Sequence, residues 1–158
     1  MRTIVIGLGN PLLSDDSVGI KAVRAVRELL DGQNRGDIDV IELYAGGIRL
    51  MDALRGYDRA VLIDAMVTGT VEPGTVRRLS PSDLLSTKNS LSVHDMDLPT
   101  ALELGRMLGI PLPSEIVIWG IEAKEVETFG EELTEEVAGA LPRVVDRICG
   151  ELDTNAAQ

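Results

Sequence analysis

Apolar residues follow two alternating patterns along this chain. Nearly continuous apolar runs at residues 4–6 and 60–63 are typical of strands that are buried on both faces of a sheet. After the first run, Ile20, Val23 and Val26 recur at helical spacing, and most positions between them are charged or small. Strands that alternate with helices indicate an α/β protein with a mostly parallel sheet.

The same periodicities, followed along the chain, predict one domain over residues 1–150 and a frayed polar tail over 151–158. Polar turns and glycines separate the elements. Strands are predicted at 2–8, 39–44, 59–65, 75–79 and 115–119, and helices at 17–30, 48–54, 97–108 and from 134 onward. Within the long polar segment 80–93, we expect a single helical turn at 82–85.

Composition and charge narrow the possible functions. Aromatic residues make up only 3% of the 158 residues, so the core must be built from Val, Ile, Leu and Ala. The formal net charge of −11 opposes phosphate and argues against a nucleic-acid partner. A single cysteine, Cys149, excludes an internal disulfide and a multi-cysteine metal site. No apolar run is long enough to span a bilayer and no signal peptide precedes the first strand, so we expect a cytoplasmic monomer.

The turn after the first strand has the sequence G-L-G-N-P-L, beginning at Gly7. Leu12 stands where the dinucleotide-binding fingerprint needs its third glycine, and no phosphate-binding lysine follows. The turn is therefore neither a dinucleotide site nor a P-loop. Gly7 and Gly9 permit a tight turn at an edge where ligands of α/β proteins gather.

Two carboxylates, Asp15 and Asp16, follow this turn where a helix should begin, and Asp64 ends the predicted strand at 59–65. We expect one of the adjacent pair to cap the helix and the other to project over the sheet edge. If the first and third strands are neighbours, the strand order reverses between them. Asp16 and Asp64 then flank the crevice at that switch point. A carboxylate at the end of an apolar strand must be solvated, paired or bound to a cation.

The only histidine, His94, lies in a predicted loop directly before the helix at 97–108. Two carboxylates and one imidazole form a ligand set for a divalent metal, with open positions left for a substrate. The chain has no H-E-x-x-H motif, no cysteine cluster and no G-x-S-x-G elbow. The candidate site therefore consists of Asp16, Asp64 and His94.

Four stretches resemble, in order along the chain, the hydrogenase maturation endopeptidases, which process the large subunit of [NiFe] hydrogenases. They are G-L-G-N-P-L-L-S-D-D-S-V-G at 7–19, A-V-L-I-D-A at 60–65, S-V-H-D-M-D-L at 92–98 and I-W-G-I-E at 118–122. The resemblance implies a three-layer α/β/α sandwich. Its five-stranded, mostly parallel twisted sheet would have the order 2-1-3-5-4, with the fourth strand antiparallel.

The resemblance also implies an activity. The enzyme would make a single cut that removes the C-terminal extension of the hydrogenase large-subunit precursor. It would act after nickel insertion and use the substrate-bound nickel as its recognition signal, without a tightly bound metal of its own. By motif position, Asp16, Asp64 and His94 would contact this metal and carry catalysis, with Asp16 or Asp64 as the candidate base.

Two short glycine-containing stretches complete the expected site. We assign Gly9, Asn10, Gly46 and Gly47 to substrate binding. The family usually has Asp-Gly-Gly-Thr after the second strand, whereas this chain has A-G-G-I beginning at Ala45. The family acid is therefore absent here, and any role that it has must be dispensed with or met elsewhere.

Three alternatives stay open. Peptidyl-tRNA hydrolase also begins with G-L-G-N-P, but it needs a His and an Asn soon afterwards and a basic face for tRNA. A nickel-sensing or chaperone-like module would bind the hydrogenase precursor without cutting it. An unrelated metal-dependent hydrolase could use the same acidic crevice, and tight metal binding by the isolated protein would favour it.

Overall fold

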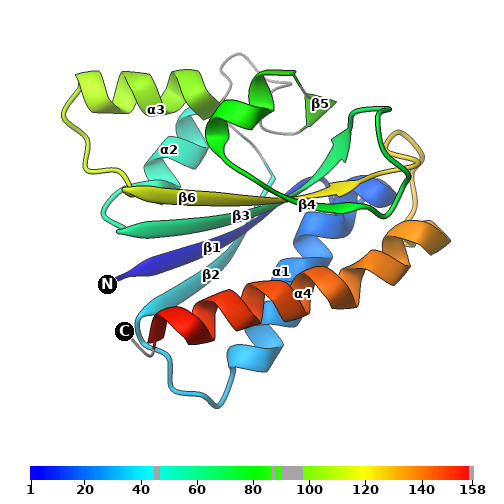
Figure 1. Cartoon of the computed structure of the whole chain (residues 1–158), viewed down its shortest axis with the longest axis horizontal. Coiled ribbons are helices and arrows are strands. Elements are labelled where there is room, and N and C mark those ends of the chain that lie inside the picture. Colours follow the sequence, from blue (N-terminus) through cyan, green and yellow to red (C-terminus); the bar gives the residue numbers. More distant parts are fainter. Residues whose placement is uncertain (45–46, 87, 90–97, 157–158) are drawn as a thin grey trace.

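The computed structural model describes residues 1–44, 47–86, 88–89 and 98–156, and it places a twisted sheet between two layers of helices (Figure 1). Helices α1 (Val18–Leu30) and α4 (Glu135–Ala156) cover one face of the sheet. Helices α2 (Ile48–Leu54) and α3 (Leu98–Met107) cover the other face. The predicted three-layer α/β/α sandwich is confirmed.

The sheet has the strand order that the sequence predicts. Its path is β2-β1-β3-β6-β4, in which β4 is antiparallel to β6 and the other pairs are parallel. Counted among the five predicted strands, this is the order 2-1-3-5-4. A sixth strand, the short β5, pairs antiparallel with the end of β3 and was not predicted. The strands are β1 (Thr3–Leu8), β2 (Ile38–Leu43), β3 (Arg59–Val67), β4 (Val76–Leu79), β5 (Lys88–Asn89) and β6 (Glu115–Glu122).

Two central strands are longer than predicted, and this changes the position of Asp64. Strand β3 continues to Val67 because it pairs with β6 along its whole length and with β5 at its end. Asp64 therefore lies inside β3, in register with Gly120 of β6, and not at the strand's end. The expectation of a strand-terminal carboxylate was wrong for β3. Asp64 does lie one residue beyond Ile63, the last β3 residue that pairs with β1.

Alternate residues of the central strands supply two separate cores. Along β3, Val61 and Ile63 pack toward α1 and α4, whereas Ala60 and Leu62 pack toward α2 and α3. Because both faces are covered, the central strands must be apolar on both sides, which explains their continuous apolar runs. The helices bury one face each. None of those in the described residues combines the length and the apolarity needed to cross a bilayer.

The first turn of α1 packs directly against the end of β1 and the neighbouring part of β3. A Cβ atom added to Gly19 would lie 2.4 Å from the carbonyl oxygens of both Leu8 and Ile63. On the facing strand, a Cβ atom on Gly7 would lie 2.3 Å from the carbonyl oxygen of Gly19. Glycine at these positions lets the helix and sheet backbones touch. This contact fixes the loop between β1 and α1 against the point where the strand order reverses.

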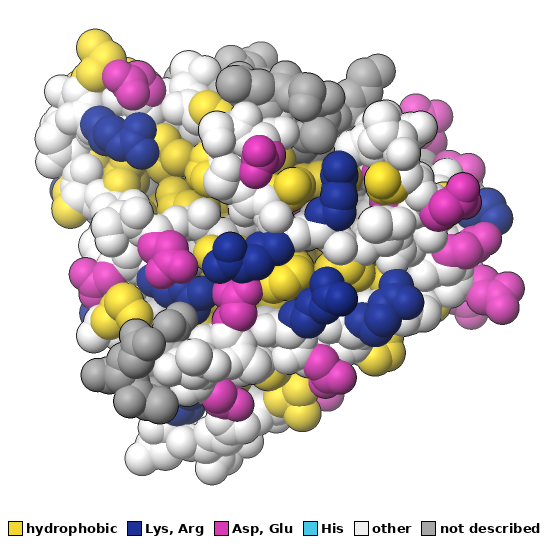
Figure 2. All heavy atoms as spheres, in the orientation of Figure 1, with side chains coloured by type: hydrophobic (Ala, Val, Ile, Leu, Met, Phe, Trp, Pro, Cys, Tyr) yellow, Lys and Arg dark blue, Asp and Glu magenta, His cyan; other side chains and the backbone are white. Residues whose placement is uncertain are grey.

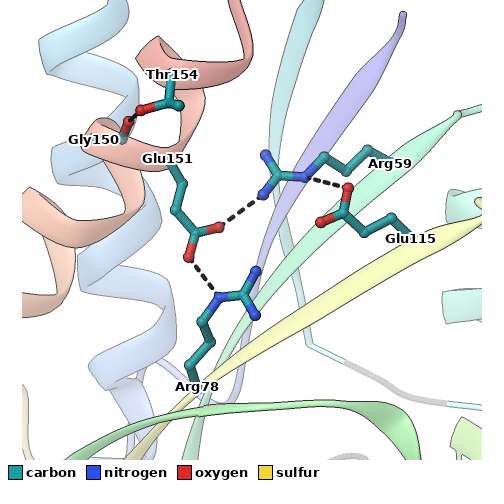
Figure 3. Close-up of a pocket in the computed structure, with 6 residues that line it drawn as sticks. All are labelled: Arg59, Arg78, Glu115, Gly150, Glu151 and Thr154. Carbon is teal, nitrogen blue, oxygen red and sulfur yellow. Dashed lines mark hydrogen bonds and ion pairs between the residues drawn. The ribbon is translucent and has the colours of Figure 1, made fainter.

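The C-terminal helix continues through residues that were expected to fray. Helix α4 reaches Ala156, and Leu152 is buried in the core shared with α1. The Glu151 carboxylate lies 2.7 Å from the guanidinium of Arg59 and 2.7 Å from that of Arg78, as Figure 3 shows. Arg59 is only 2% exposed and also pairs with Glu115 at 3.1 Å. These contacts hold Glu151 and Leu152 in the fold, and α4 extends beyond the predicted domain boundary at residue 150. Fraying of the tail stays a prediction.

Candidate functional site

The loop between β1 and α1 positions the carboxylate of Asp16. After β1 the chain turns at Gly9, whose φ of +139° suits glycine. A Cβ atom there would lie 2.0 Å from the carbonyl oxygen of Asp16. The Asn10 N–H donates to Asp16 Oδ2 at 2.9 Å, and Asn10 Oδ1 accepts from the Leu12 N–H at 2.9 Å. Gly9 and Asn10 thus shape the loop that holds Asp16, and their assignment to substrate binding stays a prediction.

Asp16 lies in the 3₁₀ turn η1 (Asp15–Ser17), which contacts β3. Its side chain is only partly exposed. Burial raises the pKa of Asp16 above the ordinary value of 3.8, and the Asn10 N–H partly opposes this effect. A carboxylate that is poorly solvated in its charged form is stabilised by a cation brought next to it.

Replacing Asp16 by asparagine should make the protein more stable at neutral pH. Asparagine keeps an oxygen for the Asn10 N–H but carries no charge that burial penalises. As pH falls through the raised pKa of Asp16 in the folded protein towards 3.8, the wild-type carboxyl takes up a proton and its penalty disappears. The advantage of the variant should therefore be full above that folded-state pKa and should vanish at low pH. Urea midpoints measured from neutral pH downward test this, and a lower midpoint for Asp16→Asn at neutral pH would contradict it.

Asp64 is fully buried and lies close to the same edge of the sheet. Strand β1 ends at Leu8, so β3 passes the end of β1 at the level of Asp64. Ala60, Leu62 and Met66 pack towards α2 and α3, and the alternation along β3 places Asp64 on that same face. Asp16 and Asp64 therefore belong to adjacent elements at the switch point between β1 and β3, as the sequence predicts.

Asp15, the neighbour of Asp16, has a different role from the one expected. It is completely buried, and its carboxylate accepts hydrogen bonds from the backbone N–H groups of Lys124, Glu125 and Thr134 at 2.8–2.9 Å. The Thr134 hydroxyl donates to the same carboxylate at 2.8 Å. Asp15 thus holds the chain at the N-terminus of α4, and it does not cap the helix that directly follows it. Local sequence could not reveal this, because every partner is distant in the chain.

The β6–α4 loop (residues 123–134) is strapped to the β1–α1 loop by further backbone hydrogen bonds. The Ser14 N–H donates to the Thr128 carbonyl at 2.9 Å, and the Gly130 N–H donates to the Leu12 carbonyl at 3.0 Å. Leu13 and Phe129 form an antiparallel bridge between the two loops. Although their backbones are joined by these hydrogen bonds, the side chains of Phe129 and Leu12 stay 80% and 59% exposed.

Glu122, which ends β6, is a third buried carboxylate, and the sequence analysis assigned it no role. It is 4% exposed and accepts hydrogen bonds from the Thr68 N–H at 2.9 Å and from the Thr68 hydroxyl. The Gly69 N–H donates to it at 3.5 Å. Glu122 therefore fixes the turn that follows β3. The sequence did contain a signal for Glu122, namely an acidic residue at the end of an apolar strand. The same signal drew attention to Asp64.

The remaining predicted site residues are placed only in part. Gly47 lies at the start of α2 with a φ of +65°, beyond the end of β2. Gly46 and His94 lie outside the described residues. Within the described ranges, no group of three or more His, Cys, Asp or Glu side chains gathers closely enough to hold a metal ion. The metal-contacting set of Asp16, Asp64 and His94 stays a prediction.

Comparisons with known proteins agree with this arrangement. The family model for hydrogenase maturation protease matches residues 23–151. The hydrogenase expression/formation protein HupD of Thiocapsa roseopersicina is 30% identical over 146 residues, which cover 85% of this chain and 60% of that protein. The hydrogenase 2 maturation protease of Escherichia coli is 26% identical over 130 residues, which cover 80% of this chain and 76% of that protein.

Solved structures show the same architecture. The hydrogenase maturating endopeptidase HybD of E. coli superposes with a TM-score of 0.78 at 24% identity, and the match covers 98% of this chain and 94% of that one. The HybD maturation protease of Thermococcus kodakarensis gives a TM-score of 0.67 at 26% identity, over 96% and 99% of the two chains. The match of the family model over most of the sequence decides the family. This chain belongs to the hydrogenase maturation protease family, whose members hydrolyse peptide bonds.

Proposed function

We propose that this protein removes the C-terminal extension from the large-subunit precursor of a [NiFe] hydrogenase, and that it cuts only after nickel has been inserted. The nickel is part of the substrate. The observation that carries the proposal is the pair of carboxylates, Asp16 and Asp64, on adjacent elements at the switch point of a maturation-protease fold.

The chemistry of the pair suits the recognition of a metal that the substrate already holds. Carboxylates and an imidazole can occupy open coordination positions on a metal bound mainly by other ligands. His94 shortly precedes Leu98, where α3 begins and packs in the core on the face of the sheet that includes Asp64. This order along the chain supports His94 as the third residue of the site.

We assign one role in the reaction to each of the two carboxyl groups of this chain. When the precursor's nickel lies at the site, it can orient the scissile peptide and polarise its carbonyl or a water molecule. Asp16 then takes the proton that the attacking water loses, since burial raises its pKa and makes it a stronger base than an exposed carboxylate. The buried carboxyl group of Asp64, on the adjacent strand, is the second group for contacting the metal.

The test is mass spectrometry of a hydrogenase large-subunit precursor after incubation with this protein. The precursor is prepared with and without nickel. We expect loss of a C-terminal peptide only from the nickel-loaded form. Equal cleavage of both forms would overturn nickel gating, and binding of several nickel-loaded precursors without cleavage would favour a chaperone role.

A further inference from the structure

Several loops at the end of the sheet that holds Asp16 and Asp64 carry exposed apolar side chains. Leu12 and Phe129 come from the two strapped loops, and the bridge next to them keeps them on adjacent backbones. Tyr44 follows β2 and is 61% exposed, and Ile48 begins α2 and is 62% exposed. Large apolar side chains exposed together around a site are typical of a contact with another polypeptide.

The loop that carries Phe129 is also strongly acidic. Figure 2 shows acidic side chains crowding the edge of the molecule where α4 begins in Figure 1. Over residues 122–136, which include this loop and its two ends, the only basic residue is Lys124. Its ammonium group pairs with Glu136 at 2.9 Å. Outside the stretch, the Lys21 ammonium reaches the Glu131 carbonyl at 2.5 Å. The glutamates of the stretch are Glu122, Glu125, Glu127, Glu131, Glu132, Glu135 and Glu136.

Leu12 and Phe129, which we call the apolar pair, lie on loops whose backbones are tied together by hydrogen bonds. Asp15 fixes the backbone of Lys124, Glu125 and Thr134, at both ends of the loop that carries Phe129. A contact surface that is already ordered loses little conformational entropy when a partner binds. The β1–α1 loop carries Leu12 and Asp16 together, so a chain that packs on the apolar pair lies beside the candidate catalytic carboxylate.

We propose that the apolar pair, together with the exposed glutamates on either side of Phe129, docks the stretch of the precursor that flanks the scissile bond. This inference rests on the proposed function. The occupant is an extended segment that is apolar and carries positive charge. Apolar side chains of the segment pack on Leu12 and Phe129, and its basic groups face Glu127 and Glu132, which are exposed on either side of Phe129.

The apolar contact is tested by the kinetics of cleavage of nickel-loaded precursor. For Phe129→Ser, KM should rise roughly tenfold, whereas kcat should stay within about twofold of wild type, because binding is lost and the carboxylates are untouched. The matched control is Met107→Ser at the end of α3, where the side chain is 76% exposed and distant from the site in Figure 1. Its KM should not change. An unchanged KM for Phe129→Ser would overturn the docking surface.

The charge of the occupant is tested by ionic strength. The wild-type KM should rise with salt, since exposed charge pairs are screened, and the double variant Glu127→Gln/Glu132→Gln should show a weaker rise. Glu28→Gln, an exposed glutamate of α1, is the control. A salt-independent wild-type KM would overturn a basic occupant.

A binding measurement separates this inference from the proposed function. If wild type binds nickel-loaded precursor but never cuts it, the proteolytic proposal fails. The docking surface is then judged by affinity alone, which should fall roughly tenfold for Phe129→Ser. Equal affinities of wild type and Phe129→Ser would overturn the surface whether or not cleavage occurs.

Discussion

Asp64→Asn should slow the processing of nickel-loaded precursor by about a hundredfold or more. Asparagine has nearly the same shape as aspartate, so the change replaces a fully buried carboxyl group without opening a cavity. An uncharged amide binds a metal more weakly and accepts no proton. The measurement is single-turnover cleavage with enzyme in excess, followed by the mass of the large subunit.

Asp16→Asn should cause a loss of similar size, and Asp31→Asn serves as the control. Asp31 is exposed after the last residue of α1, so removing its charge should leave the cleavage rate unchanged. Thermal unfolding of each variant separates loss of chemistry from loss of fold. If Asp16→Asn and Asp64→Asn both process precursor at the normal rate, the two carboxylates have no part in the reaction.

Gly19→Ala should destabilise the protein by about 3 kcal/mol or more, a large part of the stability of a domain this size. The new methyl group would lie 2.4 Å from two backbone carbonyl oxygens, and backbone cannot rotate away as a side chain can. Helix α1 would have to shift away from β1 and β3. The β1–α1 loop would move with it, so cleavage should fall as well. Urea denaturation gives the free energy of unfolding.

A glycine-to-alanine substitution at another helical position should raise the stability of the protein instead of lowering it. Gly139 lies in α4 with open space around it, so Gly139→Ala should stabilise the protein by up to about 1 kcal/mol through helix propensity. This control removes any general effect of adding a methyl group to a helical glycine. A Gly19→Ala protein with wild-type stability would show that the close contact between α1 and the sheet does not constrain the fold.

Periodicity and the matched motifs predicted the architecture well, because the two-sided core leaves a strong apolar signal in each long strand. They failed where pairing with other strands decided the outcome. Strand β3 continues past the predicted end at residue 65 to Val67 because it pairs with β6 as far as Met66 and with β5 at Met66 and Val67. Strand β5 is too short for any periodicity to register.

At the site, the sequence predicted the edge of the sheet at which Asp16 lies. It did not predict that Asp15 holds the distant β6–α4 loop instead of capping the helix that follows it. Helix-capping rules look a few positions ahead, whereas the partners of Asp15 come from the far end of the chain. The extension of α4 past residue 150 was not predicted for a related reason. Its small polar composition favours fraying, but Glu151 pairs with the buried Arg59.

The contacts of Asp15 also make the loop at the start of the chain depend on residues that are synthesised much later. Asp15 and Thr134 are 119 positions apart. A ribosome therefore adds Asp15 and Asp16 to the chain long before it reaches the residues that hold their loop. Until that last part of the chain emerges and docks, the Asp15 carboxylate lacks its partners and the loop that carries Asp16 lacks its anchor. A nascent chain therefore contains Asp15 and Asp16 well before the loop that carries them gains its anchor from residues 124–134.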